Sequence, residues 1–384
     1  MKNSMEKIKN ISFSSWPKYS KKEINKVKKI IETGKVNYWT GNYCTLFEKK
    51  FKLKFNLNYA ISVANGSVAL DAAVNVLKLS KRDEVLVTAR SYVSTASCLQ
   101  NTPARIRFID IDLDTQNIDI ESIRKNINSK TKLIICTHLA GWPCDIDKIK
   151  KMIGKRKIYI IEDCSQAHGA MIKKKFVGSM GDISVWSFCN DKIMSTLGEG
   201  GMISCKSSFL YKKLWAYKDC GKNIDKIKKK SKNKLFKWLH DFEGTNLRMT
   251  EIQAAVGIEQ LKNLNLMVKK RFGNLKTLRK KINNTKIFIP EYPNNIIHSG
   301  YRFYLYLKNP ASRNKFIKYL NANSIDANQG SCPEIYKEKR FSVKNNFKIL
   351  KNANKLGKIC VSLPSHHLMS YKDLVYMAKI INQF

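Results

Sequence analysis

Lys192 is the residue whose surroundings most clearly suggest chemistry. It stands between an apolar run, residues 185–188, and a glycine-rich turn, residues 198–201. This pattern predicts a strand end, a turn and a second strand, with the lysine between them. A lysine that is desolvated in such a place has a lowered pKa, and its amine becomes a nucleophile toward carbonyls. The alternative is that Lys192 is one more solvated lysine.

Asn65-Gly66-Ser67 follows an apolar strand and opens a helix. Glycine permits close approach of the backbone, and a helix N-terminus offers free N–H groups to a phosphate. The segment is therefore a candidate phosphate site. A simple helix cap, for which Ser67 is suited, is the alternative.

Two further positions follow predicted strands. Asp163 ends the apolar run 158–161, and a carboxylate there could hold a protonated ring nitrogen; a helix cap is the alternative. Tyr92 comes shortly after the strand that ends at Thr88. Its ring could stack on a planar cofactor, although a place in the core is equally consistent with the pattern.

Several classes of site are absent from the sequence. No Gly-x-Gly-x-x-Gly follows a strand and no Walker phosphate loop occurs, which counts against dinucleotide or ATP binding. The histidines do not fall at metal-ligand spacing, so we expect no metal site. The ten cysteines are scattered without a CxxC pair, which favours reduced cysteines in a cytosolic protein.

The elements that must position these residues alternate between strands and helices. This alternation predicts an α/β domain with a mainly parallel seven-stranded sheet, whose ligands bind at the carboxyl ends of the strands. The predicted strands are residues 59–64, 84–88, 105–109, 132–137, 157–162, 182–186 and 201–204. The predicted helices are residues 21–33, 44–51, 67–79, 120–127, 145–153, 250–282, 312–320 and 371–381. We expect a large domain over residues 1–284 and a smaller α+β domain over residues 285–384, which contains a strand at 301–307.

Composition sets the wider limits. The chain has 384 residues and a formal net charge of +41, with lysines spread over almost every predicted helix. A dedicated nucleic-acid face would be more local. The densest basic run, 222–237, is either a solvated loop or a rim that attracts a phosphorylated substrate. No apolar run is long enough to span a membrane, and the basic N-terminus lacks an apolar signal core, so a cytoplasmic location is expected.

Nine strings, taken in order, resemble the DegT/StrS family of sugar aminotransferases, which are pyridoxal-phosphate enzymes of the aspartate-aminotransferase fold. The resemblance covers nearly the whole chain, and nine strings in the family's order are hard to obtain by chance. The strings are ANGSVAL (64–70), ARSYVSTAS (89–97), THLAGWPCDID (137–147), IEDCSQAHGA (161–170), SFCNDK (187–192), GEGGM (198–202), NLRMTEIQAAVG (246–257), CPEIY (332–336) and LPSHH (363–367).

The resemblance implies a role for each matching residue. Lys192 would bind the cofactor covalently, and Asp163 would pair with its pyridine nitrogen. Gln166 would lie near the phenolic oxygen and Tyr92 would stack on the ring. The phosphate would be held by Gly66, Ser67 and Ser187, and by Asn246 of a second subunit, which implies a homodimer with shared active sites.

Two departures from the family concern the substrate side more than the cofactor side. Cys189-Asn190 stands where relatives often have a histidine or another aromatic residue, and Leu197 stands where they often have a glycine. Some relatives carry histidine in place of the lysine and dehydrate sugars, so Lys192 favours transamination. We expect an amino group to pass from glutamate or glutamine to a nucleotide-linked keto sugar, in cell-surface polysaccharide synthesis. The alternatives are a related dehydratase and a regulatory or nucleic-acid-binding protein with this fold. The sugar, the nucleotide and the carbon that is aminated are not specified by the sequence.

Overall fold

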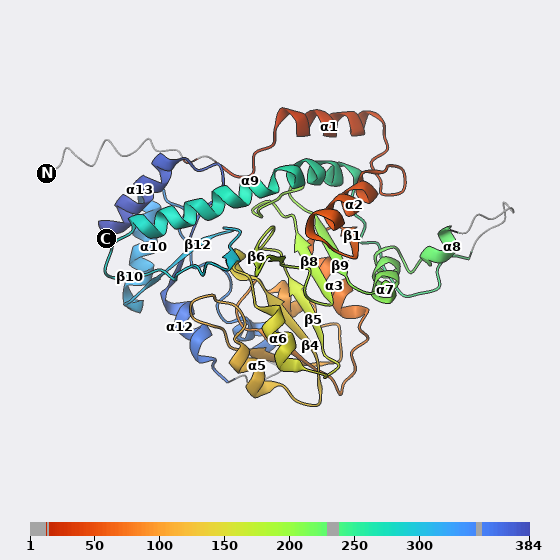
Figure 1. Cartoon of the computed structure of the whole chain (residues 1–384), viewed down its shortest axis with the longest axis horizontal. Coiled ribbons are helices and arrows are strands. Elements are labelled where there is room, and N and C mark those ends of the chain that lie inside the picture. The colour runs from red at the N-terminus through yellow and green to blue at the C-terminus, as the bar shows by residue number, and fades with distance from the viewer. Residues whose placement is uncertain (1–12, 14, 229–237, 343–347) are drawn as a thin grey trace.

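The computed structural model describes residue 13 and residues 15–228, 238–342 and 348–384. Its centre is a seven-stranded sheet with the strand order β1-β9-β8-β5-β4-β2-β3. Figure 1 shows strands β1, β9, β8, β5 and β4 of this sheet in the middle of the molecule. The strands of this sheet are β1 (Tyr59–Val63), β2 (Glu84–Thr88), β3 (Arg105–Ile109), β4 (Thr131–Thr137), β5 (Tyr159–Asp163), β8 (Ile183–Ser187) and β9 (Gly201–Cys205). The predicted α/β class and mainly parallel seven-stranded sheet are therefore confirmed.

Strand direction determines where a site can form. The pairs β2–β3, β2–β4, β4–β5 and β5–β8 are parallel, whereas β9 runs antiparallel to both of its neighbours, β1 and β8. The carboxyl ends of the parallel strands therefore meet at one edge of the sheet, where open α/β sheets bind ligands.

Both faces of the sheet are covered by helices, which explains the continuous apolar strands. In β2, for example, Val85 and Val87 pack in the same core cluster as residues of α3 and α7, whereas Leu86 points to the opposite face and packs with α6. Beside β8 and β9, that second face is covered by α2 and α9. The covering helices are α2 (Tyr43–Phe55), α3 (Gly66–Asn75), α5 (Ile120–Asn126), α6 (Ile146–Ile153), α7 (Ser208–Lys218) and α9 (Glu251–Lys281).

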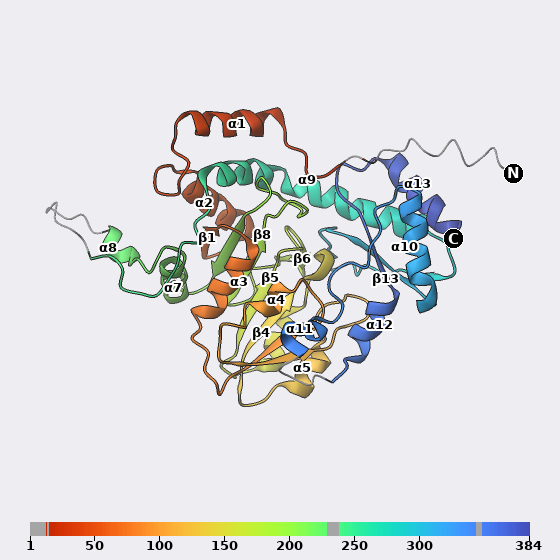
Figure 2. The same ribbon diagram turned by 180° about the vertical axis from the view of Figure 1, so that it is seen from behind.

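The C-terminal part has its own antiparallel sheet in the order β10-β12-β13, with helices packed on it (Figure 2). Its elements are β10 (Ile287–Phe288), β12 (Phe303–Leu307), α10 (Arg313–Ala322), α11 (Lys339–Ser342), α12 (Lys351–Ile359), β13 (Cys360–Leu363) and α13 (Tyr371–Asn382). A third small sheet joins β11 (Ile296–Ile297) to β6 (Met171–Ile172) and β7 (Lys175–Phe176).

The long helix α9 connects the two parts of the molecule (Figure 1). Its first half packs through Ala254 and Ile258 in the core beneath the large sheet. Its last turns contribute Leu275 and Leu278 to the core of the C-terminal part. The domain boundary between residues 284 and 285 stays a prediction, because α9 belongs to both cores.

The remaining helices are α1 (Lys21–Glu32), α4 (Ser94–Ser97) and α8 (Ile224–Lys228). Of the basic run 222–237, residues 229–237 lie outside the described residues; Lys222 and Lys226 form ion pairs with Asp219 and Asp241. Among the helices that the structure describes, none combines the length and apolarity needed to cross a bilayer.

Candidate active site

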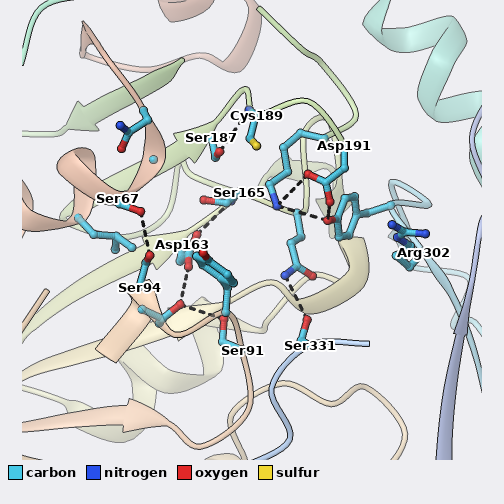
Figure 3. A pocket seen from close by; sticks show the side chains of 18 of the residues that line it. Ser67, Ser91, Ser94, Asp163, Ser165, Ser187, Cys189, Asp191, Arg302 and Ser331 are labelled. Atoms are coloured by element: carbon cyan, nitrogen blue, oxygen red, sulfur yellow. Dashed lines mark hydrogen bonds and ion pairs between the residues drawn. The ribbon is translucent and has the colours of Figure 1, made fainter. Parts of the chain in front are cut away.

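A cavity of about 540 Å³ opens at the carboxyl ends of β5 and β8, beside the N-terminus of α3 (Figure 3). Its walls also include residues of the C-terminal part, such as Tyr304 and Ser331. Seven of the eight residues predicted for the site line this cavity. They are Gly66, Ser67, Tyr92, Asp163, Gln166, Ser187 and Lys192.

Asp163 ends β5 with its carboxylate facing the cavity and is 4% exposed. One carboxylate oxygen accepts a hydrogen bond from the Thr95 hydroxyl at 2.9 Å, and the other accepts from the Ser165 N–H at 3.1 Å. Ser91 extends this network, since its hydroxyl lies 2.9 Å from that of Thr95. Asp163 therefore does cap the following turn, but it is also held by hydroxyl groups in a buried position at the edge of a site.

Glu162, the neighbour of Asp163 on β5, has a different function. Its buried carboxylate accepts hydrogen bonds from the backbone N–H groups of Gly178, Met180 and Gly181 and contacts the His138 ring at 3.0 Å. Burial opposes ionisation, but these hydrogen bonds outweigh it and lower the pKa of the Glu162 carboxyl. Glu162 thus fixes the loop before β8 and stabilises the strand that carries Asp163.

The N-terminus of α3 forms the opposite end of the cavity. Asn65 caps the helix by accepting from the Val68 N–H at 3.0 Å, so the alternative in which Ser67 is the cap was wrong. The Ser67 hydroxyl instead lies 2.8 Å from that of Ser94. Gly66 is required here, because a Cβ at this position would lie 2.6 Å from the Cβ of Ser187. The first N–H groups of the helix and the hydroxyls of Ser67 and Ser94 together form a polar cradle that suits a phosphate.

Lys192 reaches the cavity from the loop after β8, and its side chain is 14% exposed. This excludes the alternative of a freely solvated lysine. Its Nζ lies 3.3 Å from the Tyr301 hydroxyl and 3.6 Å from a carboxylate oxygen of Asp191. The predicted fall in pKa was wrong for the chain alone: burial lowers the pKa of the Lys192 ammonium, but Tyr301 and Asp191 outweigh burial and raise it.

Gln166 and Tyr92 differ in their exposure to solvent: Gln166 is buried, whereas Tyr92 is largely exposed. The buried Gln166 side chain accepts from the Ala140 N–H at 2.8 Å and donates to the Ser331 hydroxyl at 3.4 Å. Tyr92 is 64% exposed although it lines the cavity, so the alternative of a core aromatic was wrong. A large ring that is left exposed at a cavity wall is available to stack on a planar ligand.

Asn246, the eighth predicted residue, is exposed and does not line the cavity. Its backbone pairs with that of Asp219, and its side chain accepts from the Arg248 N–H at 3.3 Å. Asp219 in turn is bonded by Lys222 and Arg248. The Asn246 segment is therefore held in a defined position away from the cavity of its own chain.

Some residues of the site were not singled out from the sequence. Thr95 and Asp191 lay inside strings that were recognised, but no role was assigned to them. No sequence pattern pointed to Tyr301 and Arg302 as site residues. They come from a segment about 110 residues beyond Lys192 and reach the cavity only because of how the chain folds. Among the described residues, one group of possible metal ligands, His138, Glu162 and Cys164, has its ligand atoms within 4.8 Å of one another. The Glu162 oxygens already accept protein hydrogen bonds, and the absence of a metal stays a prediction.

Comparison with known proteins agrees with this geometry. Residues 17–382 match the DegT/DnrJ/EryC1/StrS aminotransferase family. The chain belongs to this family. A GDP-perosamine synthase from Escherichia coli O157:H7 is 30% identical over 344 residues, which cover 90% of each chain. The structure of an aminotransferase from Psychrobacter cryohalolentis is 36% identical, with a TM-score of 0.93, and covers 97% of this chain and 98% of that one. The structure of E. coli GDP-4-keto-6-deoxy-D-mannose-3-dehydratase with bound hydrated PLP is 25% identical, with a TM-score of 0.87, and covers 97% and 99%.

These findings confirm the predicted family, the fold and the cofactor. They show that the protein is a pyridoxal-phosphate-dependent sugar aminotransferase. The residues in the cavity fit pyridoxal phosphate. The cradle at α3 suits the phosphate, the Asp163 carboxylate suits a protonated ring nitrogen, and Lys192 supplies a primary amine for the aldehyde.

Proposed function

We propose that this protein transfers an amino group from glutamate or glutamine to a nucleotide-linked keto sugar during cell-surface polysaccharide synthesis. The observation that carries the proposal is that the Lys192 amine, the Asp163 carboxylate and the α3 N-terminus share one cavity. The presence of lysine at position 192, together with the family match, favours amino transfer over dehydration. The names of two relatives contain a GDP-linked sugar, GDP-perosamine in one and GDP-4-keto-6-deoxy-D-mannose in the other.

The seven predicted residues that line the cavity all have tasks in this proposal. Lys192 would hold the cofactor through its amine and would then accept and return the proton of the donor α-carbon. When bound, pyridoxal phosphate would supply the electron sink for the electron pair left on that donor α-carbon. Asp163 keeps the ring nitrogen protonated, Gln166 orients the phenolic oxygen and Tyr92 covers the ring. Gly66, Ser67 and Ser187 hold the phosphate.

Replacement of Lys192 tests the function directly. The holoenzyme is expected to show a visible absorption band that disappears when glutamate is added and returns when a GDP-linked keto sugar follows. Lys192→Ala should lack the band and the turnover, because no other lysine among the described residues lines the cavity to take its place. Lys206→Ala is a matched control, since Lys206 binds the Met180 carbonyl and does not line the cavity. Turnover by Lys192→Ala at a rate near that of the wild type would refute the assignment.

We further propose a cytoplasmic homodimer in which Asn246 completes the cavity of the partner subunit. Its fixed position outside its own cavity supports this arrangement, and ten cysteines without a disulfide suit a reducing compartment. Lys192→Ala and Asn246→Ala protomers that are mixed and allowed to exchange should regain activity. About one quarter of all sites should then be intact, because one of the two sites in each heterodimer has both residues. Absence of any recovery after verified exchange would contradict shared sites.

A further inference from the structure

Asp191, Lys192 and Tyr301 form a compact cluster at one wall of the cavity. Figure 3 labels Asp191, with dashed lines to its two neighbours. The Tyr301 hydroxyl donates a hydrogen bond to the Asp191 carboxylate. Lys192 donates to the same hydroxyl at 3.3 Å, its Nζ lies 3.6 Å from the other Asp191 oxygen, and it stands 4.8 Å from the centre of the Tyr301 ring. The ammonium therefore has three separate contacts with two residues.

The two partners come from different parts of the fold, so the cluster depends on tertiary structure. Asp191 precedes Lys192 in the loop after β8, whereas Tyr301 lies between β11 and β12. The Tyr301 backbone N–H donates to the Ala140 carbonyl at 3.1 Å, and the residue is only 9% exposed. Tyr301 is thus fixed, and it holds the more exposed Asp191 carboxylate beside the lysine.

Other titratable or charged groups surround the cluster from the neighbouring segments. They are Asp163, His168, Cys189, Glu199, Arg271 and Arg302. The His168 ring is buried, which lowers its pKa to about 3, so it is neutral near pH 7. The positive charge of Arg302 favours the ionised form of Asp191, and its guanidinium lies beside the Tyr301 ring. Arg271 interacts electrostatically with both Tyr301 and Asp191. Among the described residues, Asp191 is the carboxylate that contacts the lysine amine.

We propose that Asp191 and Tyr301 are positioning residues that hold the Lys192 ammonium whenever this amine is not bonded to the cofactor, and that Asp191 thereby sets the pH above which Lys192 acts as a base. The inference rests on the proposed role of Lys192. A lysine that is released during each half-reaction must return to the same place, and a chain of hydrogen bonds to a fixed tyrosine provides that place. Because an adjacent negative charge favours the ammonium, it also determines when the amine becomes free.

The reactivity of Lys192 in the complete chain, freed of cofactor, tests this inference. Trace acetylation with acetic anhydride between pH 6 and 11, read by mass spectrometry of the Lys192 peptide, gives the midpoint of its titration; other lysine peptides are internal standards. Asp191→Asn keeps the shape of the side chain and removes its charge. We expect its midpoint to fall by about one pH unit, so that acetylation below both midpoints is about tenfold faster.

Three further variants make the result specific. Tyr301→Phe should move the midpoint in the same direction, and Asp191→Glu should restore part of the wild-type value. Glu199→Gln removes another cavity carboxylate, one that contacts the Cys189 sulfur at 3.9 Å, and it should leave the midpoint nearly unchanged. An unchanged midpoint in both Asp191→Asn and Tyr301→Phe, or an equal shift in Glu199→Gln, would overturn the inference.

Failure of the inference is distinguishable from failure of the proposed function. Acetylation requires neither cofactor nor keto sugar, so an unchanged midpoint in an enzyme that still transfers amino groups refutes only the role of Asp191 and Tyr301. If Asp191→Asn does not fold, the midpoint of Lys192 can be measured in Tyr301→Phe, which leaves the charges of Asp191 and Lys192 in place. In the holoenzyme, the pH dependence of the visible band gives a second, independent measure of the environment of Lys192.

Discussion

The variant Gly66→Ala adds one methyl group at the start of α3. It tests whether the cost of packing this group against Ser187 exceeds the gain in helix stability that alanine brings. A Cβ at Gly66 would lie 2.6 Å from the Cβ of Ser187 and 3.2 Å from its Cα and Oγ. The nearest of these contacts involves atoms at or next to the backbone of β8, which cannot rotate away. Overpacking of this kind costs about 1–3 kcal/mol. Alanine instead of glycine in a helix recovers at most about 1 kcal/mol. We therefore expect Gly66→Ala to lower the free energy of unfolding by up to about 3 kcal/mol, and by about 2 kcal/mol if the full overpacking cost meets the full helical gain.

The same change should weaken the binding of cofactor. Displacement of the α3 N-terminus or of Ser187 removes about one charge-assisted hydrogen bond to the phosphate, worth about 1.5–3 kcal/mol, so the dissociation constant should rise by about 10- to 100-fold. Urea unfolding of the cofactor-free chain and titration with pyridoxal phosphate measure the two effects separately.

Gly273→Ala is the matched control. Gly273 lies inside α9, is exposed, and an added Cβ would meet nothing within 4 Å. This variant should gain about 0.5–1 kcal/mol of stability and keep the affinity for the cofactor of the wild type. If Gly66→Ala is as stable as Gly273→Ala and binds the cofactor equally well, then close packing of α3 on Ser187 does not shape the site.

Three other predictions concern charge. Asp163→Asn should retain the cofactor but slow the first half-reaction severely in single-turnover kinetics, because the ring nitrogen loses the carboxylate that keeps it protonated; an unchanged rate would leave Asp163 only as a cap. Burial lowers the pKa values of His168 and His298 to about 3 from 6.5, so the unfolded chain takes up protons first as the pH falls, and the free energy of unfolding should decrease by about 1.4 kcal/mol per pH unit for each histidine between these values. Urea unfolding at several pH values checks this, and His168→Phe should reduce the slope. With a net charge of +41, DNA binding should be weak, lack sequence preference and collapse as salt approaches physiological strength, whereas tight sequence-selective binding in filter or anisotropy assays would revive the regulatory alternative.

The large sheet could be predicted because its strands are buried on both faces and therefore consist of short apolar runs. The predicted boundaries of β2 and β3 coincide with those in the structure, and those of β1, β4, β8 and β9 differ by one residue. Helix α7 was missed for a physical reason. Its buried face includes Lys218, which lies 3.6 Å from the centre of the Tyr38 ring and 3.5 Å from Asp219. A buried, paired lysine has the sequence signature of an exposed residue.

The site was only partly accessible to sequence reasoning. Residues that follow strands in the large sheet, such as Asp163 and Tyr92, could be found because the carboxyl ends of parallel strands meet. Tyr301 could not be found in this way, since it reaches Lys192 through the packing of the C-terminal part. The raised pKa of Lys192 was missed for the same reason, because the residue that raises it most is Tyr301.

The shared helix α9 makes the molecule sensitive to changes in length even at positions where the side chains of the helix are exposed to solvent. Arg271, in the middle of this helix, donates to the carbonyl of Gly300, the residue before Tyr301. One inserted or deleted residue between Ala254 and Arg271 would rotate everything downstream by about 100° and shift it by about 1.5 Å. Arg271 would then leave Gly300, and Leu275 and Leu278 would leave their core. Evolution of this chain can therefore change the surface residues of α9 freely, whereas insertions and deletions must occur in the loops.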